Sequence, residues 1–368
     1  MKQDTFITDI YIKKVRHLKD FTISLGKEKK HLILTGKNGS GKTSILEELN
    51  KIFIEIDSPR EAYNKFENTL YPILNKNTRD KSSEEEGFIH AFFSAKRRDK
   101  KMIAPKGAKK IELPTDRRAK LNDYFLQYLV NLNIDLLFAK VDDNKEKIEL
   151  LEKWFLDFNT MMKQIFDDSF KIELDRTDYI FWIERDNREP FTFNTLSAGY
   201  WAIMDIVSEI IMKISTTKSK SFDCEGIILI DEIDIHLHVE LQKDILPMLT
   251  TFFPNIQFIV TTHSPFVLSS LSNTVICDLE KKFVTEDLSS YSYDALIESY
   301  FDSDKYSKEI KGKIEIFEQL SDRNDLSMSE KDEYYKLKKY FDTIPTFMAD
   351  ELAVKINEIK LKQMFKAD

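Results

Sequence analysis

The sequence has very few cysteines and no long run of apolar residues. Its only two cysteines, Cys224 and Cys277, are far apart in the chain, so neither a disulfide framework nor a zinc site is indicated. No segment approaches the roughly 18 apolar residues that a membrane-spanning helix requires. The N-terminal segment also lacks the apolar core of a secretory signal peptide. These absences predict a cytoplasmic protein without a membrane segment.

Acidic residues outnumber basic ones. The formal net charge of −8 at pH 7 argues against a protein covered in nucleic acid, but it is compatible with a local basic surface. With 368 residues, 42% of them hydrophobic, the chain is long enough for one large domain with insertions or for two domains.

A glycine-rich segment near the N-terminus matches the phosphate-binding pattern G-x-x-x-x-G-K-[ST]. A buried strand is predicted before it, over residues 31–35, and a helix after it, over residues 44–53. In such a turn consecutive backbone N–H groups hold phosphate oxygens. We expect Lys42 to reach the β- and γ-phosphates and the Thr43 hydroxyl to ligate Mg²⁺. The candidate phosphate-binding residues are Gly36, Lys37, Asn38, Gly39, Ser40, Gly41, Lys42, Thr43 and Ser44.

Chemically active side chains follow two further predicted strands. Asp231 and Glu232 come directly after the apolar run 226–230. We expect Asp231 to hold Mg²⁺ and Glu232 to act as the general base on an attacking water. His263 follows the predicted strand 257–262, from which it can reach the γ-phosphate. The alternative for His263 is a purely structural role.

The segment Leu196-Ser-Ala-Gly199 begins a long predicted helix. Ser197 and Gly199 would lie where unpaired N–H groups and the helix dipole favour an anion. The alternative is an ordinary helix start in which the Ser197 side chain is the capping group. The residues by themselves leave both interpretations open.

Residues 96–120 form a basic stretch with eleven basic and three acidic residues, a net charge of +8. We consider a surface that contacts DNA or RNA phosphates, with an ordinary solvated loop as the alternative. A further alternative is that Arg97 or Arg98 faces the nucleotide. The basic residues are Lys96, Arg97, Arg98, Lys100, Lys101, Lys106, Lys109, Lys110, Arg117, Arg118 and Lys120.

The remaining patterns predict an α/β core with helical additions. Two early strands, together with residues 31–35, are expected to form an N-terminal β layer, and residues 54–86 are expected to be helical and then an exposed loop. An aromatic stripe in a helical hairpin is interpreted as core, and the chain from 293 onward is expected to be helical. The other predicted strands are 6–13, 21–25, 88–93, 169–175, 178–184, 274–279 and 282–287, and the other predicted helices are 121–137, 144–166 and 239–253.

In combination these segments resemble the ATP-binding-cassette (ABC) ATPases, most closely the branch with the SMC heads, the recombination mediator RecF and the overcoming-lysogenisation-defect ATPases. The phosphate loop with Asn38, the signature Leu196–Gly199, the Walker B pair Asp231 and Glu232, and the switch histidine His263 carry this resemblance. It covers roughly residues 1–55 and 165–290. The sequence is also similar to many prokaryotic antiphage ATPases.

The resemblance implies bound ATP and Mg²⁺ and a head-to-tail sandwich of two copies. Each ATP would lie between the phosphate loop of one copy and Ser197 and Gly199 of the other, in a dimer or a higher even-numbered assembly. Asp234 matches the D-loop region of the family. Tyr200 departs from the usual Gln or Glu after the signature, Ile233 departs from Pro, and the Q-loop is assigned to residues 94–97.

We therefore expect an α/β fold: an ABC-type P-loop ATPase head with an N-terminal β layer, an inserted helical hairpin and a helical C-terminal region. The expected function is Mg²⁺-dependent ATP hydrolysis that gates a prokaryotic antiphage-defence module and controls a separately encoded effector such as a nuclease, as in Septu-like systems. The alternatives are a DNA-repair or recombination clamp with little turnover and a transporter nucleotide-binding subunit. The expected domains are the ATPase core at 1–55 and 165–290, an insertion at 56–164 and a helical region at 291–368.

Overall fold

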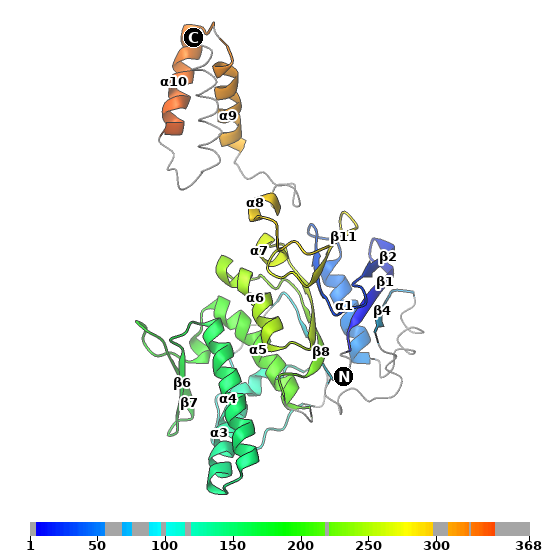
Figure 1. The fold of residues 1–368 in the computed structure, drawn as a ribbon, viewed down its shortest axis with the longest axis vertical. Coiled ribbons are helices and arrows are strands. Elements are labelled where there is room, and N and C mark those ends of the chain that lie inside the picture. The colour runs from blue at the N-terminus through cyan, green and yellow to red at the C-terminus, as the bar shows by residue number, and fades with distance from the viewer. Residues whose placement is uncertain are drawn as a thin grey trace. The chain divides into compact units, whose positions relative to one another are not determined.

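The chain divides into two compact units, Met1–Tyr291 and Ser292–Asp368, which are described separately (Figure 1). The first unit contains all three β-sheets of the described residues, and the second is helical in its described part. The computed structural model describes residues 5–55, 68–75, 88–96, 101–114, 119–217, 221–296, 308–323 and 325–342.

A six-stranded sheet forms the centre of the first unit. Five of its strands, from β10 to β5, run parallel, and β11 is added antiparallel at one edge. Every residue of β3, β9 and β10 is buried, which explains their continuous apolar character, because a parallel sheet is covered on both faces. The strands, in spatial order, are β11 (Phe283–Glu286), β10 (Thr274–Asp278), β3 (His31–Thr35), β9 (Ile256–Thr261), β8 (Glu225–Ile230) and β5 (Phe88–Phe93).

A separate antiparallel sheet has the order β2-β1-β4, with β1 at Ile7–Val15, β2 at Leu18–Ser24 and β4 at Leu70–Leu74. Two expectations about this region were wrong. β3 does not belong to this layer, because it pairs with β9 and β10 inside the central sheet. β4 is a strand within the range that was expected to be helical, and Pro72 is accommodated because β4 is an edge strand. Residues 56–67 and 76–87 of that range lie outside the described residues.

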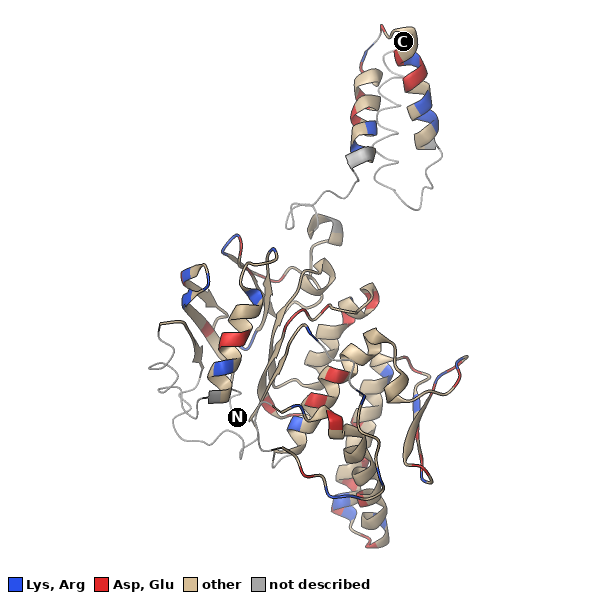
Figure 2. Cartoon of the chain, turned by 180° about the vertical axis from the view of Figure 1, so that it is seen from behind, with Lys and Arg blue, Asp and Glu red and all other residues tan. Residues whose placement is uncertain are grey.

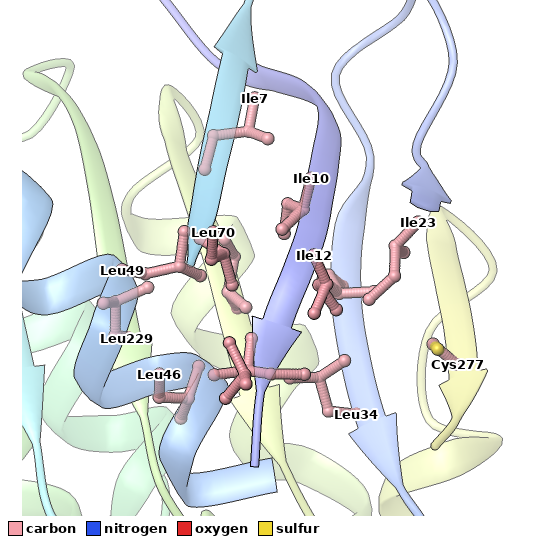
Figure 3. Packing of buried hydrophobic residues seen from close by; sticks show 14 of the residues in the cluster. Ile7, Ile10, Ile12, Ile23, Leu34, Leu46, Leu49, Leu70, Leu229 and Cys277 are labelled. Atoms are coloured by element: carbon pink, nitrogen blue, oxygen red, sulfur yellow. The ribbon is translucent and has the colours of Figure 1, made fainter. Parts of the chain in front are cut away.

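The two sheets and the first helix, α1 (Lys42–Glu55), share one hydrophobic core. A β-bulge in β1 shifts its register between Ile7 and Asp9, so Ile7 and Ile10 are both fully buried although they are three residues apart. Figure 3 shows the side chains of β1 and β4 meeting Leu46 and Leu49 of α1. This packing fixes the position of α1, and therefore of the loop that precedes it.

Helices and a small hairpin complete the first unit. Residues 122–124 form a 3₁₀ turn, η1, just before α3. Antiparallel β6 and β7 form the predicted two-stranded hairpin. Residues 56–164 were predicted to be an insertion outside the core. β5 lies within this range but is an edge strand of the central sheet, so the predicted bounds of the insertion were wrong. The helices and the hairpin strands of this part are α3 (Phe125–Val141), α4 (Lys145–Ile165), β6 (Lys171–Asp175), β7 (Ile180–Glu184), α5 (Ala198–Ser215), α6 (Val239–Phe252) and α7 (Pro265–Leu268).

The aromatic stripe of the predicted helical hairpin is core. Trp154 of α4 stacks on Phe158 at 5.4 Å between ring centroids, and Phe158 lies 6.0 Å from Phe125 of α3. Trp154 is 8% exposed and the two phenylalanines are 1% exposed or less. These rings hold the two helices together, as the sequence predicted.

The second unit is helical in its described part, as predicted. It contains α8 (Tyr293–Ala295), α9 (Lys308–Ser321) and α10 (Met328–Asp342). Phe317 of α9 stacks on Tyr334 of α10 with ring centroids 5.2 Å apart, in a small core of its own.

Charged residues lie chiefly on helices and connecting segments, while the central sheet is almost free of them (Figure 2).

An ionisable side chain, that of His31, nevertheless begins strand β3 of this sheet. His31 is 5% exposed, and its Nδ1 accepts a hydrogen bond from the Phe258 N–H at 3.0 Å. Burial, with a smaller effect of Lys29, lowers the pKa of His31 to about 4. A protonated Nδ1 could not accept this bond.

Stability should therefore fall in mild acid through His31. Because the folded-state pKa lies below the unfolded value near 6.5, the unfolded chain binds the proton more readily, and stability that is present above pH 6.5 is lost as the pH falls toward 4. The effect of this one group should be about 2 kcal/mol between pH 7.5 and pH 5. His31→Asn, which keeps an acceptor but does not titrate, should flatten the pH dependence of denaturant unfolding, whereas His17→Asn at an exposed position should not. Equal slopes for wild type and His31→Asn would contradict this.

Candidate nucleotide-binding site

The glycine-rich loop connects β3 to α1, as predicted, and α1 begins at Lys42. Gly36, Gly39 and Gly41 have φ angles of +121°, +87° and +102°, which only glycine adopts without strain. Gly36 is also tightly packed, because a Cβ there would lie 3.0 Å from Ser40 Oγ and 3.2 Å from Asp278 Oδ1. The loop therefore requires glycine for its backbone shape and for its packing.

Asp278, the last residue of β10, lies next to Gly36 of the loop. It is 5% exposed, and its Oδ1 accepts hydrogen bonds from the N–H groups of Glu280 and Lys281 at 2.9 and 3.0 Å. Glu280 in turn forms an exposed ion pair with Lys37 of the loop at 2.9 Å. Asp278 cannot be predicted as a neighbour of the loop from the sequence, because nothing local in the sequence shows that β10 lies beside β3.

Lys42 is held inside the loop. Its Nζ donates hydrogen bonds to the carbonyl oxygens of Gly36 at 2.7 Å and Lys37 at 3.2 Å. Burial lowers the pKa of Lys42, and the nearby carboxylates of Glu232 and Asp231 oppose that effect. The ammonium is thus fixed over the loop backbone, among groups that favour its charged form.

The hydroxyl of Thr43 contacts the carboxylate of Asp231. Thr43 Oγ1 lies 3.1 and 3.0 Å from the two carboxylate oxygens, although the residues are 188 positions apart in the chain. Asp231 is 2% exposed, and its backbone N–H donates to the Phe93 carbonyl at 2.8 Å. A hydroxyl and a carboxylate are oxygen ligands of the type that Mg²⁺ prefers, so these are the two residues that would hold a magnesium ion.

Thr261 links the two acidic residues. Its hydroxyl donates to Asp231 Oδ1 at 2.7 Å and accepts from the Glu232 N–H at 2.7 Å. Glu232 has a φ of +47°, an unfavourable backbone conformation for a residue with a side chain. Thr261 therefore stabilises both the carboxylate and the strained turn after β8.

His263 follows β9 and has an uncommitted ring nitrogen. Among the described residues, its buried Nε2 has no hydrogen-bond partner. Burial and, secondarily, the charge of Lys42 lower the pKa of His263, whereas Asp234 and Glu232 oppose the shift. The imidazole is therefore neutral near pH 7 and lies in the same electrostatic environment as Lys42, Asp234 and Glu232.

Asp234 is joined to the end of β9 by a short network. Thr262 Oγ1 donates to Asp234 Oδ1, and the Ser264 N–H donates to Thr262 Oγ1 at 2.9 Å. The Ser264 hydroxyl donates to Gln242 Oε1 of α6 at 2.7 Å. These bonds connect the segment after the Walker B pair to both sides of His263.

The signature segment, residues 196–199, begins α5 with Ser197 at the N-cap position. The Ser197 side chain makes no capping hydrogen bond, so the interpretation in which it caps the helix was wrong. Gly199 packs tightly, since a Cβ there would lie 3.1 Å from the carbonyl oxygen of His236. Ser197 is exposed, and in the described part of the chain no hydrogen bond joins Ser197 or Gly199 to residues 36–44.

The basic stretch is only partly described. Arg97, Arg98, Lys100, Arg117 and Arg118 lie outside the described residues, as does the last residue of the Q-loop assignment. The described lysines are exposed, and Lys120 forms an ion pair at 3.0 Å with Asp205 of α5, whose side chain is 4% exposed. These described lysines are Lys96, Lys101, Lys106, Lys109, Lys110 and Lys120.

Residues 114–269, which include the signature segment, the Walker B pair and His263, match the family described as "AAA domain, putative AbiEii toxin, Type IV TA system". The chain is similar to a Septu protein and to retron ATPases, which are relatives of the kind that its sequence patterns predicted.

Two sequence relatives and one solved structure illustrate the similarity. The chain is 28% identical to "Septu protein PtuA" of Bacillus mycoides (strain KBAB4) over 80% of its own length and 44% of that protein. It is 31% identical to "Retron Vc95 probable ATPase" of Vibrio cholerae serotype O1 biovar El Tor over 41% of its length and 34% of that protein. It is 13% identical to the SMC head in "Crystal structure of the SmcHead bound to the C-winged helix domain of ScpA", with a TM-score of 0.41 over 78% of this chain and all of that one. The chain thus spans less than half the length of these sequence relatives.

Among the described helices, none combines the length and the apolar character needed to cross a lipid bilayer. Within the same residues, no group of three or more histidine, cysteine, aspartate or glutamate side chains is arranged to hold a metal ion. The contact between Thr43 and Asp231 is a different kind of site, in which one hydroxyl and one carboxylate would share a cation with phosphate oxygens.

Proposed function

We propose that this chain binds and hydrolyses ATP with Mg²⁺. The contact between Thr43 and the buried carboxylate of Asp231 carries the proposal, because it joins the phosphate loop to the end of β8. Lys42 lies next to Thr43 in sequence, and its Nζ donates to the Gly36 carbonyl of the loop. Glu232 follows Asp231 in sequence and has the positive φ of the strained turn. The start of α1 carries Lys42 and Thr43, and the segment directly after β8 carries Asp231 and Glu232, so two separate elements contribute these groups.

The proposed roles follow from the chemistry of each side chain. Lys42 would bind the β- and γ-phosphate oxygens, and Thr43 and Asp231 would hold Mg²⁺, which neutralises phosphate charge when it is bound. Glu232 would accept the proton of the attacking water. His263, whose buried Nε2 has no hydrogen-bond partner among the described residues, would donate a hydrogen bond to the γ-phosphate. Asp234 would contact the nucleotide region from the segment after Glu232.

We further propose that a second copy of the chain completes the site. Ser197 is exposed and does not cap its own helix, so its hydroxyl and the N–H groups at the start of α5 are available to a phosphate outside the chain. ATP would favour the assembled state because both copies contact its γ-phosphate only in that state. Hydrolysis would remove this preference and release the copies.

In the cell, the proposed role is a nucleotide-gated switch in antiphage defence. The similarity to a Septu protein and to a retron ATPase supports this role. The switch would control a separately encoded effector, of which a nuclease is the leading candidate. A DNA-repair or recombination clamp of the same fold would bind ATP and assemble, but would turn over very little. A transporter subunit would instead co-purify with a membrane partner.

Glu232→Gln should separate binding from hydrolysis. The amide keeps the shape of the side chain but cannot accept a proton, so ATP affinity should be retained while turnover falls at least about 100-fold. Light scattering should show that this variant rises to an even-numbered assembly in Mg-ATP and dissociates without nucleotide. Glu240→Gln, an exposed change in the first turn of α6, is the matched control and should behave as wild type.

Two results would contradict the proposal. Undiminished turnover in Glu232→Gln would remove this residue from the role of general base. A monomer at all ATP concentrations would mean that a second copy does not complete the site. Negligible turnover in wild type, together with ATP-dependent assembly, would favour the clamp over the hydrolase.

We also propose that the basic stretch contacts nucleic acid phosphates. The exposed positions of Lys106, Lys109 and Lys110, close together in sequence, support this proposal. Each phosphate contact that is lost should lower the slope of log affinity against log salt concentration by about 0.9 on duplex DNA and about 0.7 on single strands.

The triple change of these three lysines to alanine should therefore weaken binding to DNA or RNA and flatten its salt dependence, as measured by fluorescence anisotropy. The matched control replaces Lys331, Lys336 and Lys339 of α10, which are equally exposed and basic. If both triple variants lose affinity equally, only net charge matters. The specific assignment of the basic stretch would then be wrong.

A further inference from the structure

Tyr200, which departs from the Gln or Glu expected after the signature, has a defined partner. It lies in the first turn of α5, directly after Gly199. Its ring stacks on that of Phe166, with ring centroids 4.8 Å apart and an angle of 26° between the planes. Phe166 is the C-cap residue of α4. The unusual residue therefore joins the signature segment to the end of the helical hairpin.

Arg185 lies over both rings. Its guanidinium carbon is 5.7 Å from the ring centroid of Phe166 and 5.6 Å from that of Tyr200. Its Nη2 donates to the Phe166 carbonyl at 3.1 Å, and its Nε donates to the carboxylate of Asp167 at 2.8 Å. The same guanidinium forms an ion pair with Asp167, and its side chain is only 8% exposed. We call Phe166, Asp167, Arg185 and Tyr200 the arginine clamp.

The clamp connects three separate elements. Arg185 follows the last residue of β7, Phe166 and Asp167 follow α4, and Tyr200 belongs to α5. Two further contacts stabilise the same region. Phe166 also stacks on Phe170, with ring centroids 5.1 Å apart, and the Asp186 N–H donates to the Ser169 hydroxyl at 3.1 Å. The hairpin side of the clamp is thus rigid, and Tyr200 is its contact with the signature segment.

Only arginine can make this set of contacts. Its planar guanidinium stacks on aromatic rings and presents several N–H donors in fixed directions at the same time. The lysine ammonium is a compact charge without a plane, so it could pair with Asp167 but could not also cover two rings. The Arg185 side chain is only 8% exposed, so its stacking on the two rings is largely shielded from water, whereas its partner Asp167 is 43% exposed.

We propose that Arg185 is a positioning residue for the signature segment. This inference rests on the proposed function, in which Ser197 and Gly199 complete the ATP site of a second copy. Through Tyr200, the clamp sets the direction in which α5 begins, and therefore where the Ser197 hydroxyl and the first N–H groups of the helix point. A shift of α4 or of the β6–β7 hairpin would move this edge of the site without touching the phosphate loop.

A purely structural role makes a different prediction. If the clamp only stabilises the fold, its loss should lower the unfolding temperature and affect all activities together. If it positions the signature segment, nucleotide affinity at the phosphate loop should survive while assembly and turnover are lost. Amide hydrogen exchange of residues 196–201 should also become faster without nucleotide, since this readout reports the local order of the segment itself.

The test compares Arg185→Lys with Arg176→Lys, the same change at an exposed position in the turn between β6 and β7. Arg185→Lys should lower ATP-dependent assembly and turnover by about 10- to 100-fold, because small misplacements of a catalytic edge have effects of that size. Its affinity for a non-hydrolysable ATP analogue should change less than about twofold, since the phosphate loop is untouched. Arg176→Lys should match wild type. Tyr200→Phe keeps the ring and should retain activity, whereas Tyr200→Leu should reproduce the loss.

Three results would overturn the inference. Arg185→Lys that behaves as Arg176→Lys would remove any role for the clamp. Equal losses of analogue affinity and turnover would make the role structural. Unchanged hydrogen exchange over residues 196–201 would separate the clamp from the signature segment. Failure of the proposed function has its own readout: wild-type protein would bind ATP but would neither assemble nor hydrolyse it. That result would also contradict the positioning role.

Discussion

The arrangement of this protein depends on one buried carboxylate. Asp231 is 2% exposed, and its two oxygens are met by the hydroxyls of Thr43 and Thr261, which come from α1 and β9. A buried carboxylate is stable only when such partners replace water, and each partner that is removed costs on the order of 1–3 kcal/mol. The parallel order β3-β9-β8 is what brings these groups together, because α1 follows β3. The same bonds that stabilise the carboxylate therefore assemble the phosphate-binding edge of the sheet.

This edge includes backbone of positive φ. Glu232 has a φ of +47°, and the phosphate loop has three glycines with positive φ. Such a conformation persists at a residue with a side chain only where the surrounding structure enforces it, and the Thr261 hydroxyl accepts the Glu232 N–H. The signature segment is built differently: it begins α5 and contacts Phe166 and Arg185, which directly follow α4 and β7. The proposed site shared between two copies would therefore combine two separately supported segments.

Sequence patterns predicted the elements that are defined locally. β3, β8, β9 and the phosphate loop are continuous in sequence, so their apolar runs and glycine spacing identify them. β4 was missed because Leu70–Leu74 contains a proline and becomes a strand only through its pairing with β1. The bridging role of Thr261 depends on the adjacency of β8 and β9, and the contacts of Arg185 depend on how three elements meet. Such features are set by tertiary packing, which no local pattern reports. The catalytic and binding roles of the predicted site residues remain predictions.

The most direct test of the shared site is complementation between two inactive variants. Lys42→Ala would disable the phosphate loop, and Ser197→Arg would disable the signature segment; each variant alone should show background turnover. In an equimolar mixture, half of randomly formed dimers contain one copy of each, and such a dimer has one intact site out of two. The mixture should therefore recover about a quarter of wild-type ATP turnover. A mixture that stays at background while wild type is active, or full activity of Ser197→Arg alone, would contradict the account.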